Sequence, residues 1–183
     1  MKVLDSKVCA INDWPQPKNV QEVRQFYGLV NYYRRFIRHF SIIAAPLSDL
    51  FKSEDNDKRK RRPIVWSTGH QVAFERLKKA ITTAPVLIQP DSMKPYTIET
   101  DSSDVGNGRT LYQQGDDGKL HPVAFDGRKL QGAELWYPMH EKELLAIKDV
   151  LQKWHHYIEN GLPIMVITDH DSLKYMNTVQ KPG

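Results

Sequence analysis

Cysteine is almost absent from this 183-residue chain, in which Cys9 is the only one. A single cysteine excludes an intramolecular disulfide and a zinc site built from several thiolates. No apolar run approaches the roughly 18 residues that a membrane-spanning helix needs, and the amino terminus lacks a signal-peptide pattern. We therefore expect an intracellular protein, cytoplasmic or nuclear, with no membrane partner.

Internal repeats and low-complexity tracts are absent as well, and the composition is that of a folded protein. Hydrophobic residues make up 40% of the chain and charged residues 26%, which is ordinary for globular proteins. The length fits one domain or two small ones. The net charge of +4 suits a polyanionic partner such as nucleic acid, but it equally suits an ordinary, mildly basic protein.

The first part of the chain carries helical signals. Asn19 can cap one helix and Thr68 can cap another over residues 70–83, because side-chain oxygens at these positions accept from free backbone N–H groups. Apolar residues recur at helical spacing after both caps. Between them, residues 53–63 are highly charged, which is typical of a solvated connector. The pattern predicts a helical region over residues 1–84.

From residue 95 onward the pattern changes to strands. The expected elements are strands at 95–101, 106–113 and 119–125, a helix at 139–159, a strand at 163–169 and a short helix capped by Asp171. Alternating β-branched and aromatic residues mark the first strand. The apolar run at 163–169 is typical of a strand buried on both faces. The order β-β-β-α-β-α predicts an α/β fold with a sheet of mixed direction.

Three acidic residues come from three of these elements. Asp101 ends the first strand, Asp169 ends the apolar strand, and Glu143 precedes Ile147 and Val150 by four and seven positions. That spacing places Glu143 on the sheet-facing side of the long helix. Two simpler roles stay open: Asp at a strand end is commonly a turn former, and an acid early in a helix favours the helix dipole.

Carboxylates that converge need cations. Parallel neighbouring strands would present Asp101 and Asp169 side by side, and such carboxylates stay ionised only if a cation neutralises them. Mg²⁺ prefers oxygen ligands of this kind. Two such ions about 4 Å apart can activate water and stabilise a departing oxygen in phosphodiester cleavage. The acids therefore predict a metal-dependent nuclease site.

Cationic residues gather in two places. Arg34, Arg35 and Arg38 lie in a region rich in Tyr and Phe, and we expect them to contact nucleic acid. A second, unbroken basic run consists of Lys58, Arg59, Lys60, Arg61 and Arg62. This run can contact phosphates or serve as a nuclear import signal, or it can simply be a solvated loop.

Several stretches resemble the polyprotein of gypsy-like LTR retrotransposons, among them NVQEVRQFYGLVNYYRRFI, TAPVL, TDSSD, EKELLAI and TDHDSLKYM. In the family these stretches belong to the end of the reverse transcriptase (its thumb or connection) and to the ribonuclease H domain that follows. The similarity covers nearly the whole chain, in the same order. It implies a small α-helical thumb-like segment over residues 1–84 and a ribonuclease H-like domain over 85–183 that lacks its C-terminal part.

The resemblance also implies an activity. Asp101, Glu143 and Asp169 fall on three of the family's four metal-binding acids. The family hydrolyses the RNA strand of an RNA–DNA hybrid with Mg²⁺ or Mn²⁺. Asp101 would bridge two ions, while Glu143 and Asp169 would each favour one. The family's polymerase acids lie upstream of this region, so we expect no DNA synthesis from this chain alone.

Departures from the family pattern leave a second function open. The family's fourth acid lies in a later helix, beyond Gly183, so we expect one metal site to be weakened. Arg109 and Thr110 stand where the family has small apolar residues, and Asp126-Gly127 stands where it has an aromatic residue and a serine. The alternative is a catalytically inactive captured fragment that binds nucleic acid or a protein partner.

Overall fold

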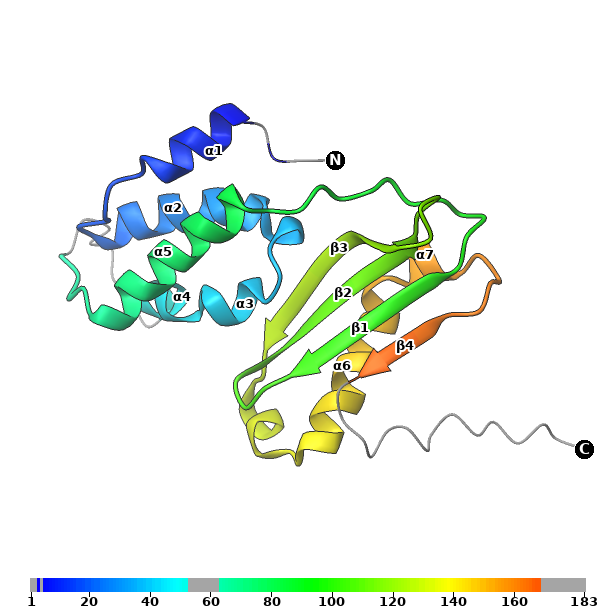
Figure 1. Ribbon diagram of the computed structural model, residues 1–183. Coiled ribbons are helices and arrows are strands. Elements are labelled where there is room, and N and C mark those ends of the chain that lie inside the picture. Colours follow the sequence, from blue (N-terminus) through cyan, green and yellow to red (C-terminus); the bar gives the residue numbers. More distant parts are fainter. Residues whose placement is uncertain (1–2, 4, 53–62, 169–183) are drawn as a thin grey trace, which may run out of the picture.

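The computed structural model describes residues 3, 5–52 and 63–168, which form a group of helices followed by a sheet (Figure 1). The first helices are α1 (Asp5–Asn12), α2 (Val20–Tyr32), η1 (Arg34–Phe36), α3 (Phe40–Ile43), α4 (Ala45–Lys52) and α5 (Thr68–Thr82). We refer to them together as the helical segment. No helix in these ranges is long and apolar enough to cross a membrane.

Local capping explains where the two longest helices of this segment begin. The Asn19 side chain accepts a hydrogen bond from the Glu22 N–H. α2 begins at Val20, the residue after Asn19, as predicted. α5 begins earlier than predicted, because Ser67 rather than Thr68 is the cap. The Ser67 hydroxyl accepts from the His70 N–H, and the His70 ring accepts from the Ser67 N–H, so both orphan donors are satisfied.

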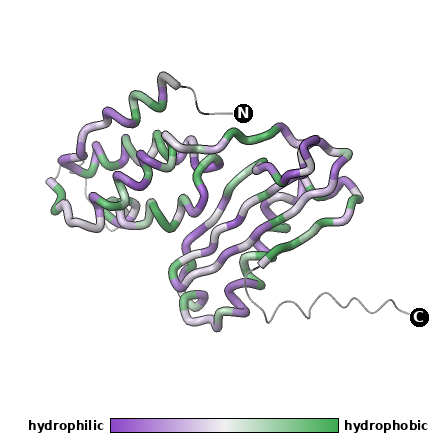
Figure 2. The backbone as a smooth tube through the Cα atoms, in the orientation of Figure 1, coloured by the Kyte–Doolittle hydropathy of each residue, from purple (hydrophilic) through white to green (hydrophobic). Residues whose placement is uncertain are grey.

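The helical segment has its own apolar core. Phe26 of α2 and Phe74 of α5 meet with their ring centroids 4.5 Å apart, and Leu47 of α4 is fully buried beside them. Polar and apolar residues alternate along these helices (Figure 2), so each helix turns one stripe inward. Phe125 of the sheet also enters this core, which joins the two parts of the chain.

The sheet has four strands in the described residues: β1 (Tyr96–Ser102), β2 (Gly106–Gln114), β3 (Leu120–Lys129) and β4 (Met165–Thr168). Their order is β3-β2-β1-β4. β2 runs antiparallel to both β1 and β3, whereas β4 runs parallel to β1. The predicted α/β fold, with a mixed sheet and flanking helices, is confirmed.

Helices flank this sheet on both sides. α6 (Met139–Lys153) packs against β1 and β2, where Val150 and Trp154 join Ile98 and Leu111 in a second apolar core. α3 and η1 of the helical segment contact β2 and β3. In Figure 1, α6 lies behind the sheet and the helical segment lies at the β3 side.

The structure corrects two details of this half. The helix predicted over 139–159 is wrong at its end, because the Trp154 backbone leaves helical geometry (φ −108°, ψ 17°) before the short α7 (His155–Ile158). The prediction that the strand at 163–169 is buried on both faces is wrong too. Met165 and Ile167 are exposed, because β4 ends the strand order and no described element covers that side.

The helix predicted at Asp171 lies outside the described residues. The 3₁₀ helix η2 (Gly132–Trp136) precedes α6 and was not predicted.

Candidate functional site

Asp101 is an exposed carboxylate near the end of β1. Thr100, the residue before it, is buried and points toward α6. Because strand side chains alternate, Asp101 points to the opposite face, where 46% of its side chain is exposed. The Nε2 atom of His39, from the helical segment, lies 3.6 Å from Asp101 Oδ2. A ligand can therefore reach this carboxylate beside the helical segment.

Glu143 lies about one turn into α6 and is almost completely buried, with 1% of its surface exposed. The hydroxyl of Thr168 donates to Glu143 Oε2 at 3.2 Å, and that of Thr100 donates at 3.5 Å. These two threonines are register partners across β1 and β4. The prediction that Glu143 faces the sheet is confirmed. A carboxylate buried this deeply needs donors or a cation around it.

The third predicted acid, Asp169, lies outside the described residues. The parallel pairing of β1 with β4 that was expected to bring it beside Asp101 is present as far as Thr168. Among the residues with a described position, no three His, Cys, Asp or Glu side chains converge on one point where an ion could bind. Asp101 and Glu143 lie at the same end of β1 but on opposite faces of the strand.

A hollow of about 270 Å³ lies next to Asp101 and is also lined by Arg38, Glu99, Thr100, Ile167 and Thr168. The Arg38 guanidinium donates to Glu99 Oε1 at 2.7 Å, and the Tyr112 hydroxyl donates to Glu99 Oε2 at 2.8 Å. Burial and this contact with Glu99 raise the pKa of Tyr112 above its ordinary value. The hollow thus brings together one cation, Arg38, and two partly exposed carboxylates, Glu99 and Asp101, of which Glu99 is already paired with the arginine.

The other predicted nucleic-acid contacts lie elsewhere. Arg34 donates to Asp126 Oδ1 at 2.7 Å and to the carbonyl of Gly127 at 3.1 Å, so it is engaged within the protein. The Arg35 guanidinium lies 5.2 Å from the Phe36 ring centroid. Both line a larger hollow of about 580 Å³ beside β3, together with Lys153. The run Lys58, Arg59, Lys60, Arg61 and Arg62 lies outside the described residues.

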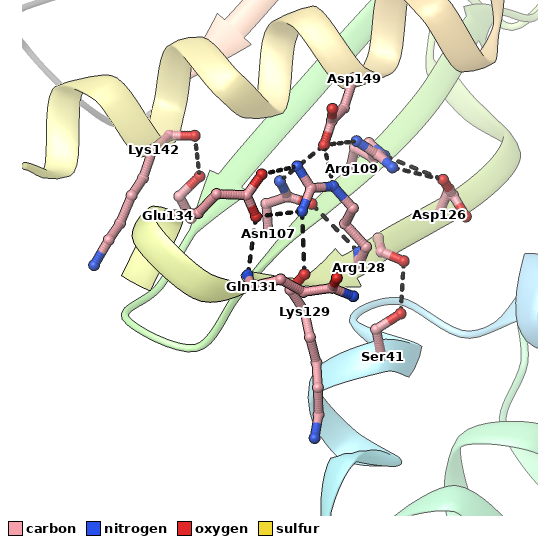
Figure 3. A network of polar contacts seen from close by, with 12 residues as sticks. Ser41, Asn107, Arg109, Asp126, Arg128, Lys129, Gln131, Glu134, Lys142 and Asp149 are labelled. Atoms are coloured by element: carbon pink, nitrogen blue, oxygen red, sulfur yellow. Dashed lines mark hydrogen bonds and ion pairs between the residues drawn. The ribbon is translucent and has the colours of Figure 1, made fainter. Parts of the chain in front are cut away.

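A polar network that the sequence reasoning did not assemble lies between α6 and the sheet (Figure 3). Arg109 pairs with Asp126 at 2.9 Å and with Asp149 of α6 at 3.3 Å. Arg128 binds Asp149 and forms two hydrogen bonds to Glu134. Arg109 and Asp126 each stood out in the sequence, but nothing there indicated that they form a pair.

Lys142 is a second residue that sequence reasoning missed. It is 97% buried, with 3% of its surface exposed, although a lysine between two glutamates reads as a solvated residue. Its ammonium contacts Asp104 Oδ1 at 3.0 Å, and its carbonyl accepts from the Ser102 hydroxyl at 3.3 Å. Lys142 therefore ties the start of α6 to the loop that follows Asp101.

Oxygen donors dominate the end of β1, and they fit a hard divalent cation. Asp101, Glu143 and the hydroxyls of Thr100 and Thr168 are all oxygen ligands of the kind that Mg²⁺ and Mn²⁺ prefer. A nitrogen, Nε2 of His39, lies 3.6 Å from Asp101 Oδ2, and burial lowers the pKa of this ring below its ordinary value. Among the described residues these oxygens do not meet at one point, because Asp101 and Glu143 lie on opposite faces of β1.

Comparison with known families matches residues 66–166 to the RNase H-like domain found in reverse transcriptase. The Tf2-3 and Tf2-4 transposon polyproteins of Schizosaccharomyces pombe are each 40% identical to the chain over 161 residues, 87% of its length. The chain spans only 12% of each polyprotein. These relatives confirm the resemblance to the LTR retrotransposon polyprotein.

Solved structures show the same fold. The foamy viral protease-reverse transcriptase in complex with double-stranded DNA superposes with a TM-score of 0.77 at 23% identity, over 98% of this chain and 36% of that one. The same viral protein in complex with RNA/DNA hybrid gives 0.75 at 24% identity, over 95% and 22%. The family match covers more than half of the chain, and this chain therefore belongs to the family of RNase H-like domains found in reverse transcriptases of retroelement polyproteins.

Proposed function

We propose that this chain binds RNA–DNA hybrid and hydrolyses the RNA strand by metal-dependent phosphodiester cleavage. One observation carries the proposal: Glu143 is buried against the hydroxyls of Thr100 and Thr168, near the paired ends of β1 and β4, and Thr100 is the residue that precedes Asp101 in the chain. A buried carboxylate is costly to a fold unless it serves a bound cation or its partners. The related foamy viral protein has been seen with RNA/DNA hybrid, which supports the choice of substrate.

The proposed site uses Asp101, Glu143 and Asp169 to hold Mg²⁺ or Mn²⁺. When bound, such ions activate water and stabilise the departing oxygen; we propose two ions, one of them held weakly. Thr100 and Thr168 orient Glu143 through their hydroxyls. The division into a thumb-like segment over 1–84 and a ribonuclease H-like domain over 85–183 belongs to the same proposal.

Arg38 is proposed to bind a phosphate of the substrate. Its guanidinium lines the hollow beside Asp101 and rests on Glu99, which remains hydrogen-bonded to Tyr112 if the arginine leaves. Arginine binds phosphate through two parallel N–H donors. A phosphate in the hollow would bring the substrate strand against the Asp101 carboxylate.

A cleavage assay with the full 183-residue chain, labelled hybrid and Mg²⁺ or Mn²⁺ tests the activity. Asp101→Asn and Glu143→Gln should each lower the cleavage rate by at least about 100-fold, because each removes a charged ligand. Asp116→Asn is the matched control: this carboxylate is fully exposed on the β2–β3 turn, bound only to Lys94. Cleavage by Asp101→Asn at the original rate would refute the assignment.

A non-catalytic binding module is the second candidate. It is favoured by the opposite orientation of Asp101 and Glu143 and by the position of His39 against Asp101. Hybrid binding without cleavage by the unaltered chain would support this candidate, and affinity should then fall steeply with salt as phosphate contacts are screened. An affinity for hybrid that does not change with salt concentration would instead favour a protein partner.

A further inference from the structure

The larger hollow beside β3 lies where the two apolar cores of the molecule meet. Its volume is about 580 Å³, within the range of about 300–1,000 Å³ that is typical of small-ligand sites. Phe125, in its lining, belongs to the core of the helical segment, whereas Val123 and Trp154 belong to the core between α6 and the sheet. These three buried side chains give the seam hollow, as we call it, an apolar lining.

Three segments that are distant in the sequence form the walls of the seam hollow. They are η1, residues 87–90 after α5, and the end of α6 together with α7. The Ile88 N–H donates to the Pro122 carbonyl at 3.0 Å, and Arg34 of η1 donates to Asp126 at 2.7 Å. These contacts hold two of the walls against β3 before any ligand binds, which limits the conformational entropy lost on binding.

The seam hollow carries an excess of positive charge. Arg34, Arg35 and Lys153 line it, and Asp126 is the only carboxylate among the described residues of its lining. Because Asp126 is bound by Arg34 at 2.7 Å and by Arg109 at 2.9 Å, it does not offset the charges of Arg35 and Lys153. The hollow therefore favours an anion, and phosphate is the anion that arginine and lysine side chains commonly bind in proteins.

Aromatic rings lie beside these cations. The ring centroids of His156 and Tyr157, both in α7 and both in the lining, are 4.2 Å apart. The Tyr157 ring is half-buried and also lies 6.1 Å from the ring of Tyr96, so its orientation is restricted. A partly exposed ring in a hollow offers a face on which a nucleic-acid base can stack. Only an unpaired base can reach such a ring, because bases in a duplex are stacked on one another.

From these observations we propose that the seam hollow binds an unpaired nucleotide of a single-stranded nucleic acid. Arg35 and Lys153 meet its phosphate, and the rings of α7 provide the stacking surface for its base. Arg34 remains bound to Asp126 and forms part of the wall. Charge and rings together favour a nucleotide over an acidic peptide, which needs the charge but not the stacking surface.

This site is separate from the one proposed for hybrid cleavage. Val123 and Trp154 lie on the side of the sheet that α6 covers, whereas Asp101 points to the opposite face. The inference therefore goes beyond hybrid cleavage and does not depend on it. A chain with both sites would hold a hybrid and a single strand at the same time.

The test measures fluorescence anisotropy of the full chain with a labelled oligothymidylate of about eight nucleotides, without metal ions and over a salt series. Lys153→Gln removes the charge, and Tyr157→Leu removes the ring but keeps an apolar side chain in its half-buried place. His156→Ala is a second ring variant, at an exposed position. Lys148→Gln is the matched control, because Lys148 is an exposed lysine of the same helix that does not line the hollow. Thermal unfolding checks the fold of each variant.

We expect Lys153→Gln to reduce the slope of log affinity against log salt by about 0.7, as for one lost phosphate contact of a single strand. Tyr157→Leu should weaken binding by about 10-fold at an unchanged slope, because stacking releases no counterions, and His156→Ala should act in the same direction. Lys148→Gln should bind like the original chain. Unchanged affinity in the variants of all three lining residues would overturn the proposal.

Two further measurements define what else would overturn it. If a poly-glutamate peptide displaces the oligothymidylate and Tyr157→Leu has no effect, the hollow binds acidic peptides and the proposal is wrong. Hybrid cleavage by Lys153→Gln should proceed at the original rate, and its loss at unchanged single-strand affinity would instead place Lys153 in the cleavage site. Because single-strand binding is measured without metal, a chain that cleaves no hybrid still gives a decisive result for the seam hollow.

Discussion

Arg109 and Asp126 face each other across β2 and β3, and the guanidinium donates two hydrogen bonds to one carboxylate oxygen, at 2.9 Å from Nη2 and 3.2 Å from Nε. Both side chains are nearly buried, with 5% and 8% exposed. The resemblance noted in the sequence made each residue unexpected when taken alone. In the structure the two opposite charges form one structural unit, to which Arg34 and Asp149 also belong.

The first prediction is that either half of this pair is costly to remove alone. Asp126→Asn leaves the buried Arg109 guanidinium with Asp149 only, and should lower the free energy of unfolding by about 3 kcal/mol. Arg109→Met should cost less, about 1–2 kcal/mol, because Asp126 keeps its ion pair with Arg34 and Asp149 keeps Arg128. Urea unfolding of both single variants and the double variant measures this.

The double variant is the informative comparison. Its loss of unfolding free energy should be smaller than the sum of the two single losses by at least about 1 kcal/mol, because the effects of mutating two contacting residues do not simply add. Strict additivity would mean that Arg109 and Asp126 contribute independently, and the pairing would then explain neither departure.

Local patterns were enough to predict most of the fold. Asn19 caps α2 because its side chain reaches a backbone N–H three residues on, which depends only on nearby residues. The exposure of Met165 and Ile167 could not be predicted in this way. An apolar strand reads the same at the end of a sheet as at its centre, and only the tertiary arrangement decides what covers it.

The candidate site divides along the same line. Helical spacing predicted the orientation of Glu143, which the structure confirms. His39 was missed because its contact with Asp101 joins segments distant in the chain, and no periodicity marks it. Arg109 gave a signal as an unexpected residue, but its partner could be identified only once β2 and β3 were in register.

The second prediction concerns Arg34 and Arg38, which the sequence predicted to contact nucleic acid in the same way. Arg38→Ala should weaken hybrid binding and reduce the slope of log affinity against log salt by about 1, as for one lost phosphate contact. Arg34→Ala should mainly lower stability, by about 1–2 kcal/mol, because its guanidinium is bound to Asp126 and Gly127. Filter binding across a salt series and urea unfolding distinguish the two effects. Equal loss of affinity in both variants would contradict the division.

The third prediction concerns two glycines with opposite surroundings. Gly108→Ala should destabilise the chain by about 1–2 kcal/mol, since the new methyl group meets the His39 ring. The same change in a His39→Asn background should cost much less. Gly28→Ala is the matched control: it lies inside α2 with no heavy atom within 4 Å of the added Cβ, so it should stabilise by about 0.5–1 kcal/mol. A Gly108→Ala cost that is unchanged without the ring would contradict the proposed packing.

The fourth prediction concerns pH and the ion pair between Arg128 and Glu134. The two parallel hydrogen bonds, at 2.6 and 2.9 Å, hold the pKa of Glu134 below its ordinary value of 4.5, and the Gln131 N–H adds to the effect. Because the folded pKa is lowered, the pair stabilises the protein above about pH 4.5, and this contribution is lost as the pH falls through the lower, folded pKa.

Glu134→Gln should therefore cost about 1 kcal/mol near pH 7, a value suited to a partly exposed but bidentate pair. The difference from the unaltered chain should shrink as the pH is lowered below 4.5 and through the lowered, folded pKa, because the carboxyl of the unaltered chain then becomes protonated as well. Urea unfolding over a series of pH values from 7 downward measures this difference. Asp116→Asn is the control. Asp116 also pairs with a cation, Lys94, but its carboxylate is fully exposed, so no measurable change in the free energy of unfolding is expected. A Glu134→Gln cost that stays constant with pH would show that the side chain stabilises η2 by packing and not by its charge.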